Sequence, residues 1–452
     1  MKRKLKTVLA LFLSAASLIS VSGCGASSAT SSASTGSAQS AAASESAGAP
    51  AQGSLAGQTI RVVAANHDYG EVIKGLIPQF EEQTGIKVEL ESYADDPLTQ
   101  KLTVELTSGN SSMDVFMTRP LQDGLLFHKN GWYETLDAYI NDPEKTSAEW
   151  DYDDFVTLDW SSGTIKDTTF IPVTNEFEML YYNKAMFAEA GLEPPTTFDE
   201  LMETAKQLTD PEKGVYGIVS RGNMGAATSP FSGYLFGFGG DYLSDGRCAL
   251  ATEGSIKAFQ YYGELLANYG PPGAINMAWP QCVPIFLDKK AAMFTDAAGL
   301  LPQVSDLGED LGLAIMPGGK PWIAPTWGLS IAATSTKKDA AWQFIQWATS
   351  KEIMKVCALE RVTQTRRSVM EDPQVVAAQH PGFAEVAAHA SENGIPYDKP
   401  VMLQVGQARD YLGEVIVKSI ESGGTADISA LAQDCAQKVD KLLEESGELK
   451  AS

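Results

Sequence analysis

Hydrophobic and polar positions alternate in two different periods along the first part of the chain. Residues 58–65 and 86–90 are strand-like, whereas the apolar residues of 72–80 recur at helical spacing and stop at Gly85. A second helix over 97–106 and a strand over 113–118 follow. This strand–helix order predicts an α/β lobe, whose ligands meet the loops at the carboxyl ends of the strands.

Polar residues occupy two of these loops. Asn66, His67 and Asp68 follow the first strand, and Arg119 follows the strand over 113–118. We therefore expect these four side chains to contact a ligand. Simple turn chemistry remains an alternative for His67 and Asp68.

The central stretch of the chain, residues 169–208, has clear local signals. An apolar run over 169–173 leads to Glu176, and a second apolar segment covers 179–182. Asn183 is placed to cap a helix over 184–189, which Gly191 ends. Thr197 and Glu200 form a capping pair for a helix over 198–208.

The second half of the chain adds aromatic and charged candidates. Arg221 follows a strand over 215–219, Trp279 follows a Gly-Pro-Pro-Gly turn at 270–273, and Asp296 ends an apolar run over 291–295. Trp327 lies in the apolar segment 322–335. Hydroxyl groups of a sugar need charged or amide partners, and its C–H faces need aromatic rings. Each tryptophan can equally belong to a lobe core.

Several of these segments resemble family 1 of the bacterial extracellular solute-binding proteins. The resemblance rests on the element order around Glu176, on Pro-Pro-Thr-Thr-Phe-Asp-Glu-Leu at 194–201, and on the 291–296 segment Ala-Ala-Met-Phe-Thr-Asp. It continues through 322–335 to Thr-Arg-Arg-Ser at 365–368, where Gln364 departs from the expected proline. The resemblance covers nearly all of the chain after the N-terminal segment. These segments resemble in particular the polyol-binding subgroup of the family.

This resemblance implies a two-lobed, maltose-binding-protein-like α/β fold of the periplasmic-binding class. It implies a carbohydrate or polyol held between the lobes and delivered to the permease of an ABC importer, with Arg366 as a further ligand contact. We expect the first lobe to comprise 58–172 plus 297–332, and the second 173–296 plus 333–452. Crossings near 172, 296 and 333 would form the hinge.

The N-terminal residues predict an anchored protein. Four basic residues precede an apolar segment over 7–19, which is too short to span a bilayer. Val-Ser-Gly-Cys24 follows and looks like a lipobox, so we expect a signal peptide over 1–23, lipid on Cys24 and a flexible tether to residue 57. The protein would then lie on the extracytoplasmic face of the cell membrane.

Net charge and the absence of known motifs argue against several other classes of function. The net charge of −23 becomes −27 without the basic residues of 1–23, which argues against nucleic acid and anionic lipid as partners. No CxxC, HExxH, GxSxG or phosphate-loop motif occurs. We expect a monomeric binding protein without cofactor or metal, rather than an enzyme.

Two alternatives remain open. Abundant acidic residues allow a glycosidase pair, and the tyrosine pairs 181–182 and 261–262 allow capture of ferric ion. Cys248, Cys282, Cys357 and Cys435 are expected in the second lobe, either as free thiols or as disulfides.

Overall fold

The computed structural model of the protein describes residues 55–109, 112–156 and 158–449. The predicted signal peptide, Cys24 and nearly all of the predicted tether lie outside these residues. None of the described helices is long and apolar enough to cross a membrane.

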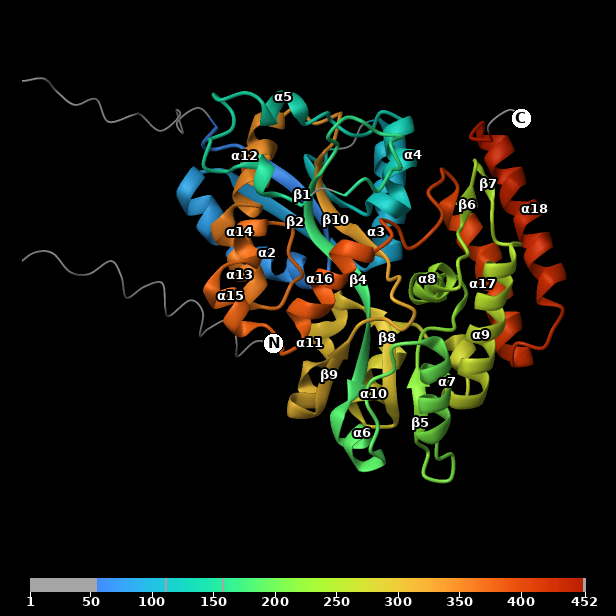
Figure 1. Ribbon diagram of the computed structural model, residues 1–452. Coiled ribbons are helices and arrows are strands. Elements are labelled where there is room, and N and C mark those ends of the chain that lie inside the picture. Colours follow the sequence, from blue (N-terminus) through green and yellow to red (C-terminus); the bar gives the residue numbers. More distant parts are fainter. Residues whose placement is uncertain (1–54, 110–111, 157, 450–452) are drawn as a thin grey trace, which may run out of the picture. The chain divides into compact units, whose positions relative to one another are not determined.

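A mixed sheet begins with three parallel strands. β2 (Lys87–Tyr93), β1 (Thr59–Ala65) and β3 (Val115–Thr118) lie side by side, and β10 (Ile323–Ile331) joins β3 in the antiparallel direction. Helices α2 (Asp68–Thr84) and α3 (Asp95–Ser108) connect these strands (Figure 1). The predicted α/β class is confirmed.

β4 (Ile171–Asn183) is one strand of 13 residues, whereas the sequence predicts two apolar segments. Its first half pairs with β10, and its second half pairs with β8 (Ala291–Ala297) and β9 (Leu311–Ala314). β5 (Tyr216–Val219) lies parallel to β8. The strand continues through Asn175 and Glu176 because both are buried and the ladder with β10 includes them.

The helix caps predicted for the central stretch, residues 169–208, are confirmed. The side-chain oxygen of Asn183 accepts a hydrogen bond from the Met186 N–H at 3.1 Å and caps α6 (Lys184–Ala190), and Gly191 has a φ of 68°. Thr197 and Glu200 form a reciprocal capping box on α7 (Phe198–Gln207).

Apart from several short 3₁₀ turns, the remaining described elements connect and cover the sheet. They are the π-helical turn η1 (Pro120–Gly124), the hairpin of β6 (Leu243–Ser244) and β7 (Arg247–Cys248), and the helices α4 (Leu125–Lys129), α5 (Asp137–Ile140), α8 (Thr228–Gly237), α9 (Glu253–Tyr269), α10 (Trp279–Leu287), α11 (Leu301–Val304), α12 (Lys338–Ala348), α13 (Lys351–Leu359), α14 (Arg367–Met370), α15 (Pro373–Ala378), α16 (Phe383–Asn393), α17 (Val405–Ser422) and α18 (Ile428–Ser446).

Hydrophobic cores divide the described residues into two lobes. The first core surrounds β1 and β3 and includes buried residues of α12 and α13. The second core lies with α8, α9, α17 and α18, and the third with α10, α11 and α16. We name the elements of the first core the first lobe, and those of the other two cores the second lobe.

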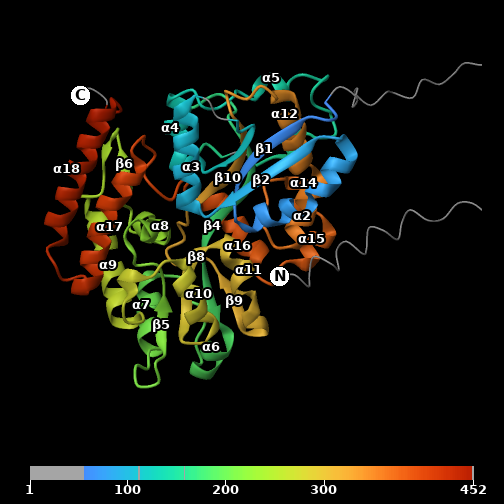
Figure 2. The same ribbon diagram turned by 180° about the vertical axis from the view of Figure 1, so that it is seen from behind.

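These lobes differ from the predicted division. Residues 340–375 bury their apolar side chains in the first core, although 333–452 is predicted for the second lobe. Residues 300–323 pack in the second and third cores, although 297–332 is predicted for the first lobe. The chain therefore crosses within β4, within β10, and between α15 and α16. Figures 1 and 2 both show α12, α14 and α15 beside β1 and β2.

The physical reason is long-range strand pairing. Glu178 of β4 faces Ala297 of β8, and Leu180 faces Ala314 of β9. The chain after residue 296 thus stays with the second half of β4, and no local sequence pattern encodes this register.

Candidate functional site

Two of the predicted loop residues of the first lobe, His67 and Arg119, lie beside Trp327 of β10. The ring centroids of His67 and Trp327 lie 5.7 Å apart, and the guanidinium carbon of Arg119 lies 5.8 Å from the Trp327 ring. His67 directly precedes α2, and Arg119 directly follows β3. Both side chains therefore come from carboxyl ends of parallel strands, as the sequence predicts.

Contacts join this cluster to the second lobe. His67 Nε2 lies 3.8 Å from Glu176 Oε1 in the middle of β4. Asp68 Oδ2 accepts a hydrogen bond from Gln303 Nε2 at 3.0 Å. The loops after β1 and β3, together with Glu176 and the facing side chains of the second lobe, form what we name the cleft.

Arg221 and Asp296 form a largely buried ion pair near Glu176. Arg221 Nε donates to Asp296 Oδ2 at 2.7 Å, and Nη2 donates to Oδ1. Although burial opposes the charged form, Asp296 raises the pKa of Arg221 above its ordinary value. The sequence singles out both residues, but it does not predict that they bind each other.

Two carboxylic acids share the cleft face of β4. Burial raises the pKa of Glu176, an effect that the nearby charge of Arg221 moderates. Burial, with the neighbouring charge of Asp296, raises the pKa of Glu178 well above its ordinary value. Glycines make room for both: a Cβ on Gly299 or Gly233 would come within 2.4 Å of an oxygen of Glu176 or Glu178.

Sequence reasoning missed three polar residues of the second lobe. Arg409 of α17 donates from Nη1 to Gln122 Oε1 of the first lobe at 2.6 Å. Asp398 and Lys399 form a 2.7 Å ion pair, and burial, together with the charges of Arg409 and Arg119, lowers the pKa of Lys399. No motif marks these residues, although Gln122 belongs to the loop in which the sequence predicts ligand contacts.

The sequence of residues 64–355 matches a family described as bacterial extracellular solute-binding protein. The match spans more than half of the chain. The chain belongs to this family. It is accordingly a binding protein and not an enzyme.

Curated relatives and solved structures agree with this assignment. The chain of this solute-binding protein is 29% identical to an erythritol/L-threitol-binding protein of Mycolicibacterium smegmatis over 73% of this chain and 75% of the relative. It is 28% identical to a mannitol-binding protein of Pseudomonas aeruginosa over 68% and 72% of the two chains.

A solved structure gives the same fold. A solute-binding protein from Agrobacterium radiobacter in complex with ribitol is 29% identical, has a TM-score of 0.76, and is matched over 86% of this chain and 99% of its own. The expected two-lobed binding-protein fold is therefore confirmed.

Two of the predicted site residues, Asn66 and Trp279, are exposed at the surface. Trp279 is the first residue of α10, and 38% of its surface is exposed. Asn66 is exposed, and its backbone N–H donates to the Tyr93 carbonyl at 2.8 Å. Trp322, in contrast, is a fully buried residue of the second core.

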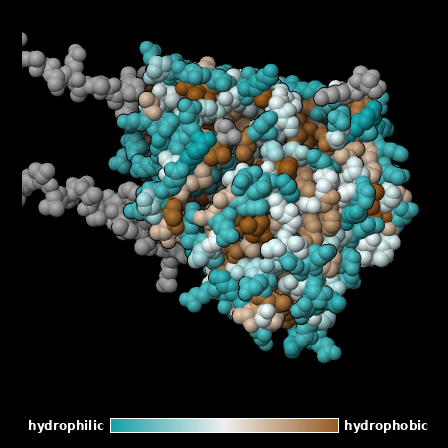
Figure 3. Space-filling model, viewed as in Figure 1, coloured by the Kyte–Doolittle hydropathy of each residue, from teal (hydrophilic) through white to brown (hydrophobic). Residues whose placement is uncertain are grey.

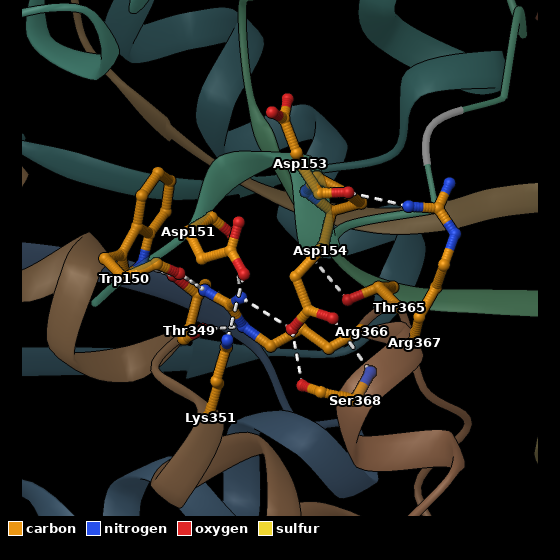
Figure 4. Close-up of polar contacts among 11 residues, drawn as sticks. Trp150, Asp151, Asp153, Asp154, Thr349, Lys351, Thr365, Arg366, Arg367 and Ser368 are labelled. Atoms are coloured by element: carbon orange, nitrogen blue, oxygen red, sulfur yellow. Dashed lines mark hydrogen bonds and ion pairs between the residues drawn. The ribbon is translucent and has the colours of Figure 1, made fainter. Parts of the chain in front are cut away.

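Arg366 departs from its predicted role as a ligand contact in this solute-binding protein. Its guanidinium is fully buried in the first lobe (Figure 4), where Nε donates to the Thr349 carbonyl at 2.7 Å and Nη2 to the Trp150 carbonyl at 2.7 Å. Nη1 donates to Asp154 Oδ2 at 3.0 Å, and the ring centroid of Phe155 lies 3.8 Å away. All three nitrogens thus bind protein groups, and we assign Arg366 to the first-lobe structure.

The tyrosine pairs offer no ferric site. Tyr181 donates its hydroxyl to the Ala297 carbonyl at 2.7 Å, and Tyr262 donates to the Arg221 carbonyl at 2.7 Å. Within the described ranges, no group of three or more His, Cys, Asp or Glu side chains is arranged to hold a metal ion.

The four described cysteines are free thiols. Cys357 lies in the first core, whereas the sequence predicts all four in the second lobe. The difference follows from the position of α13, which packs with the first lobe.

Proposed function

We propose that this protein captures a sugar or polyol in the cleft and delivers it to the permease of an ABC importer. The observation that carries the proposal is a set of buried polar atoms at the cleft that, among the described residues, have no hydrogen-bond partner. They are His67 Nδ1 and both carboxyl oxygens of Glu178. Buried polar atoms are normally hydrogen-bonded, so these atoms suit a ligand rich in hydroxyl groups.

The relatives support the same ligand class. Those described above bind erythritol, L-threitol or mannitol by name, and the related structure holds ribitol. The first-lobe loops and Trp327 would contact one side of the polyol. Glu176, Glu178 and Trp279 would contact the other side.

Thermal-shift screening of the purified protein with erythritol, L-threitol, mannitol, ribitol and maltotriose tests this proposal. A ligand that binds only the native state increases the free energy of unfolding by about 2.7 kcal/mol at a hundredfold excess over Kd. The melting temperature rises accordingly. Another relative, from Sinorhizobium fredii, is described as a probable amino-acid-binding protein, so amino acids form the comparison set. A shift with an amino acid and with none of the polyols would contradict the proposal.

The anchor is part of the proposed function. The Val-Ser-Gly-Cys segment at 21–24 would direct lipid attachment to Cys24, and the Ser- and Ala-rich residues after it would let the binding domain reach the permease. Cys24→Ala should abolish incorporation of labelled fatty acid and release the protein from membranes. Membrane retention of the variant in high salt, with label still incorporated, would exclude Cys24 as the attachment site.

A further inference from the structure

A second cavity lies on the face of β4 opposite the cleft. Successive side chains of a strand point to opposite faces, so Glu176 and Glu178 face the cleft while Asn175 and Phe177 face away from it. Asn175 and Phe177 line a cavity of about 320 Å³, a volume at the lower end of small-molecule sites.

This cavity touches all three segments that connect the lobes. Asn175 belongs to β4, Ile323 to β10, and His380 to the crossing between α15 and α16. Its walls come from both lobes, since Val375 belongs to the first core and Leu301 to the third. Figure 3 shows hydrophobic residues exposed among hydrophilic ones on the face that carries α16. A molecule bound here would contact both lobes at once.

The polar atoms of the cavity define what it would bind. Asn175 Nδ2 donates to the Val156 carbonyl at 3.1 Å, and Gln364 Nε2 donates to the Val362 carbonyl at 2.7 Å. The two amide oxygens find no hydrogen-bond partner in the part of the chain that the structure describes. The hydroxyl of Thr363 also lacks a partner among the residues described, and Asn175 and Thr363 are 7% and 8% exposed. Most other lining residues are apolar. Two buried acceptors and a hydroxyl in an apolar wall match a small uncharged molecule with a hydroxyl or N–H donor.

We propose that this cavity is a second binding site, for a small, mostly apolar alcohol or phenol, and that its occupation favours the conformation seen here. In this conformation the lobes contact each other across the cleft through His67 and Glu176, Asp68 and Gln303, and Gln122 and Arg409. An occupant that fits the cavity in this conformation shifts the population toward it. By reciprocity, such an occupant also tightens binding of any cleft ligand that needs the same conformation. Only this last step rests on the proposed function.

Benzyl alcohol is a suitable probe, because it combines an apolar ring with one hydroxyl donor. Saturation-transfer NMR should detect its binding to the full protein. Ala387→Phe places a ring in the cavity from α16 and should weaken binding at least tenfold. Thr363→Val keeps the side-chain shape, removes the hydroxyl, and should weaken binding about two- to tenfold. Ala188→Phe, at an exposed position of α6, is the matched control and should bind like the parent.

The proposal is wrong if benzyl alcohol does not bind, or if the folded Ala387→Phe and Thr363→Val variants bind it as tightly as the parent. It is also wrong if benzyl alcohol does not lower the radius of gyration of the protein. A dimer that forms with increasing concentration and disappears in Ala387→Phe would also overturn it, because a second copy would then cover the cavity. Trp279→Ala separates this inference from the proposed function, since that variant should lose polyol binding and keep benzyl alcohol binding.

Discussion

Arg409 Nη1 donates a hydrogen bond of 2.6 Å to Gln122 Oε1 and so joins α17 to the loop after β3. Gln122→Ala removes this contact between the lobes. A hydrogen bond to a charged group contributes about 1.5–3 kcal/mol, so we expect polyol affinity to fall about ten- to a hundredfold. Without ligand, the radius of gyration from small-angle scattering should increase. Gln407→Ala is the control, because Gln407 donates to Tyr411 within the same helix.

Trp279→Ala tests the aromatic side of the proposed cleft. The indole is 38% exposed, so its removal should change the free energy of unfolding by only about 0.5 kcal/mol. Ligand affinity should fall by about 1.5–3 kcal/mol if the ring covers a C–H face of the polyol. Titration calorimetry measures the affinity, and unchanged binding would show that Trp279 is only a surface residue.

Asp296→Asn should destabilise the fold itself. The structure shows a fully buried carboxylate bound twice by Arg221, so the substitution leaves a largely buried guanidinium without its counter-charge. We expect a loss of about 3–5 kcal/mol in the free energy of unfolding by urea. The double variant with Arg221→Gln should lose less than the sum of the single variants.

Arg366→Met should lower stability and leave the ligand affinity unchanged. Methionine fills much of the buried volume, but Asp154 loses its buried partner, at a cost of about 3–5 kcal/mol. Arg367→Met is the control, because Arg367 is exposed and its Nη1 donates to the Asp153 carbonyl at 2.6 Å (Figure 4). A tenfold loss of polyol affinity in a folded Arg366→Met protein would restore its predicted role in binding.

Helix caps and strand-end loops could be predicted from the sequence because they depend on interactions between residues close in the chain. The Asn183 cap, the Thr197–Glu200 box and the loops at the ends of β1 and β3 depend on neighbours within a few residues. The partners of Arg366 and Arg409 could not be predicted in this way. Asp154 lies 212 residues from Arg366, and Gln122 lies 287 residues from Arg409.

The predicted lobe boundaries differ from the division of the hydrophobic cores for the same reason. The positions of β8 and β9 depend on their register against β4, and the position of α12–α15 depends on apolar contacts with β1 and β3. A buried arginine in the first-lobe core and a ligand-binding arginine have the same sequence signature. Only the set of groups around each guanidinium distinguishes them.

Glu178→Gln should change how stability depends on pH. The native state holds the proton of Glu178 at pH values where the unfolded chain, with an ordinary pKa near 4.5, has released it. The unfolded state therefore binds fewer protons, and stability falls as pH rises from about 4.5 toward the raised native pKa. Each unit of elevation costs about 1.4 kcal/mol at high pH. Glutamine cannot ionise, so the variant should match the parent at pH 4 and exceed it at pH 8.

Glu200→Gln gives the control of opposite sign. Hydrogen bonds from the Thr196 N–H, the Thr196 hydroxyl and the Thr197 N–H lower the pKa of Glu200. The ionised Glu200 therefore contributes to stability above its ordinary pKa, and this contribution is lost as pH falls. The Glu200→Gln variant should be less stable than the parent at pH 8 and equally stable at low pH. Urea unfolding at pH 4, 6 and 8 measures both trends. A parallel pH profile for the parent and Glu178→Gln would show that Glu178 is ionised in the native protein and has a partner that offsets its burial.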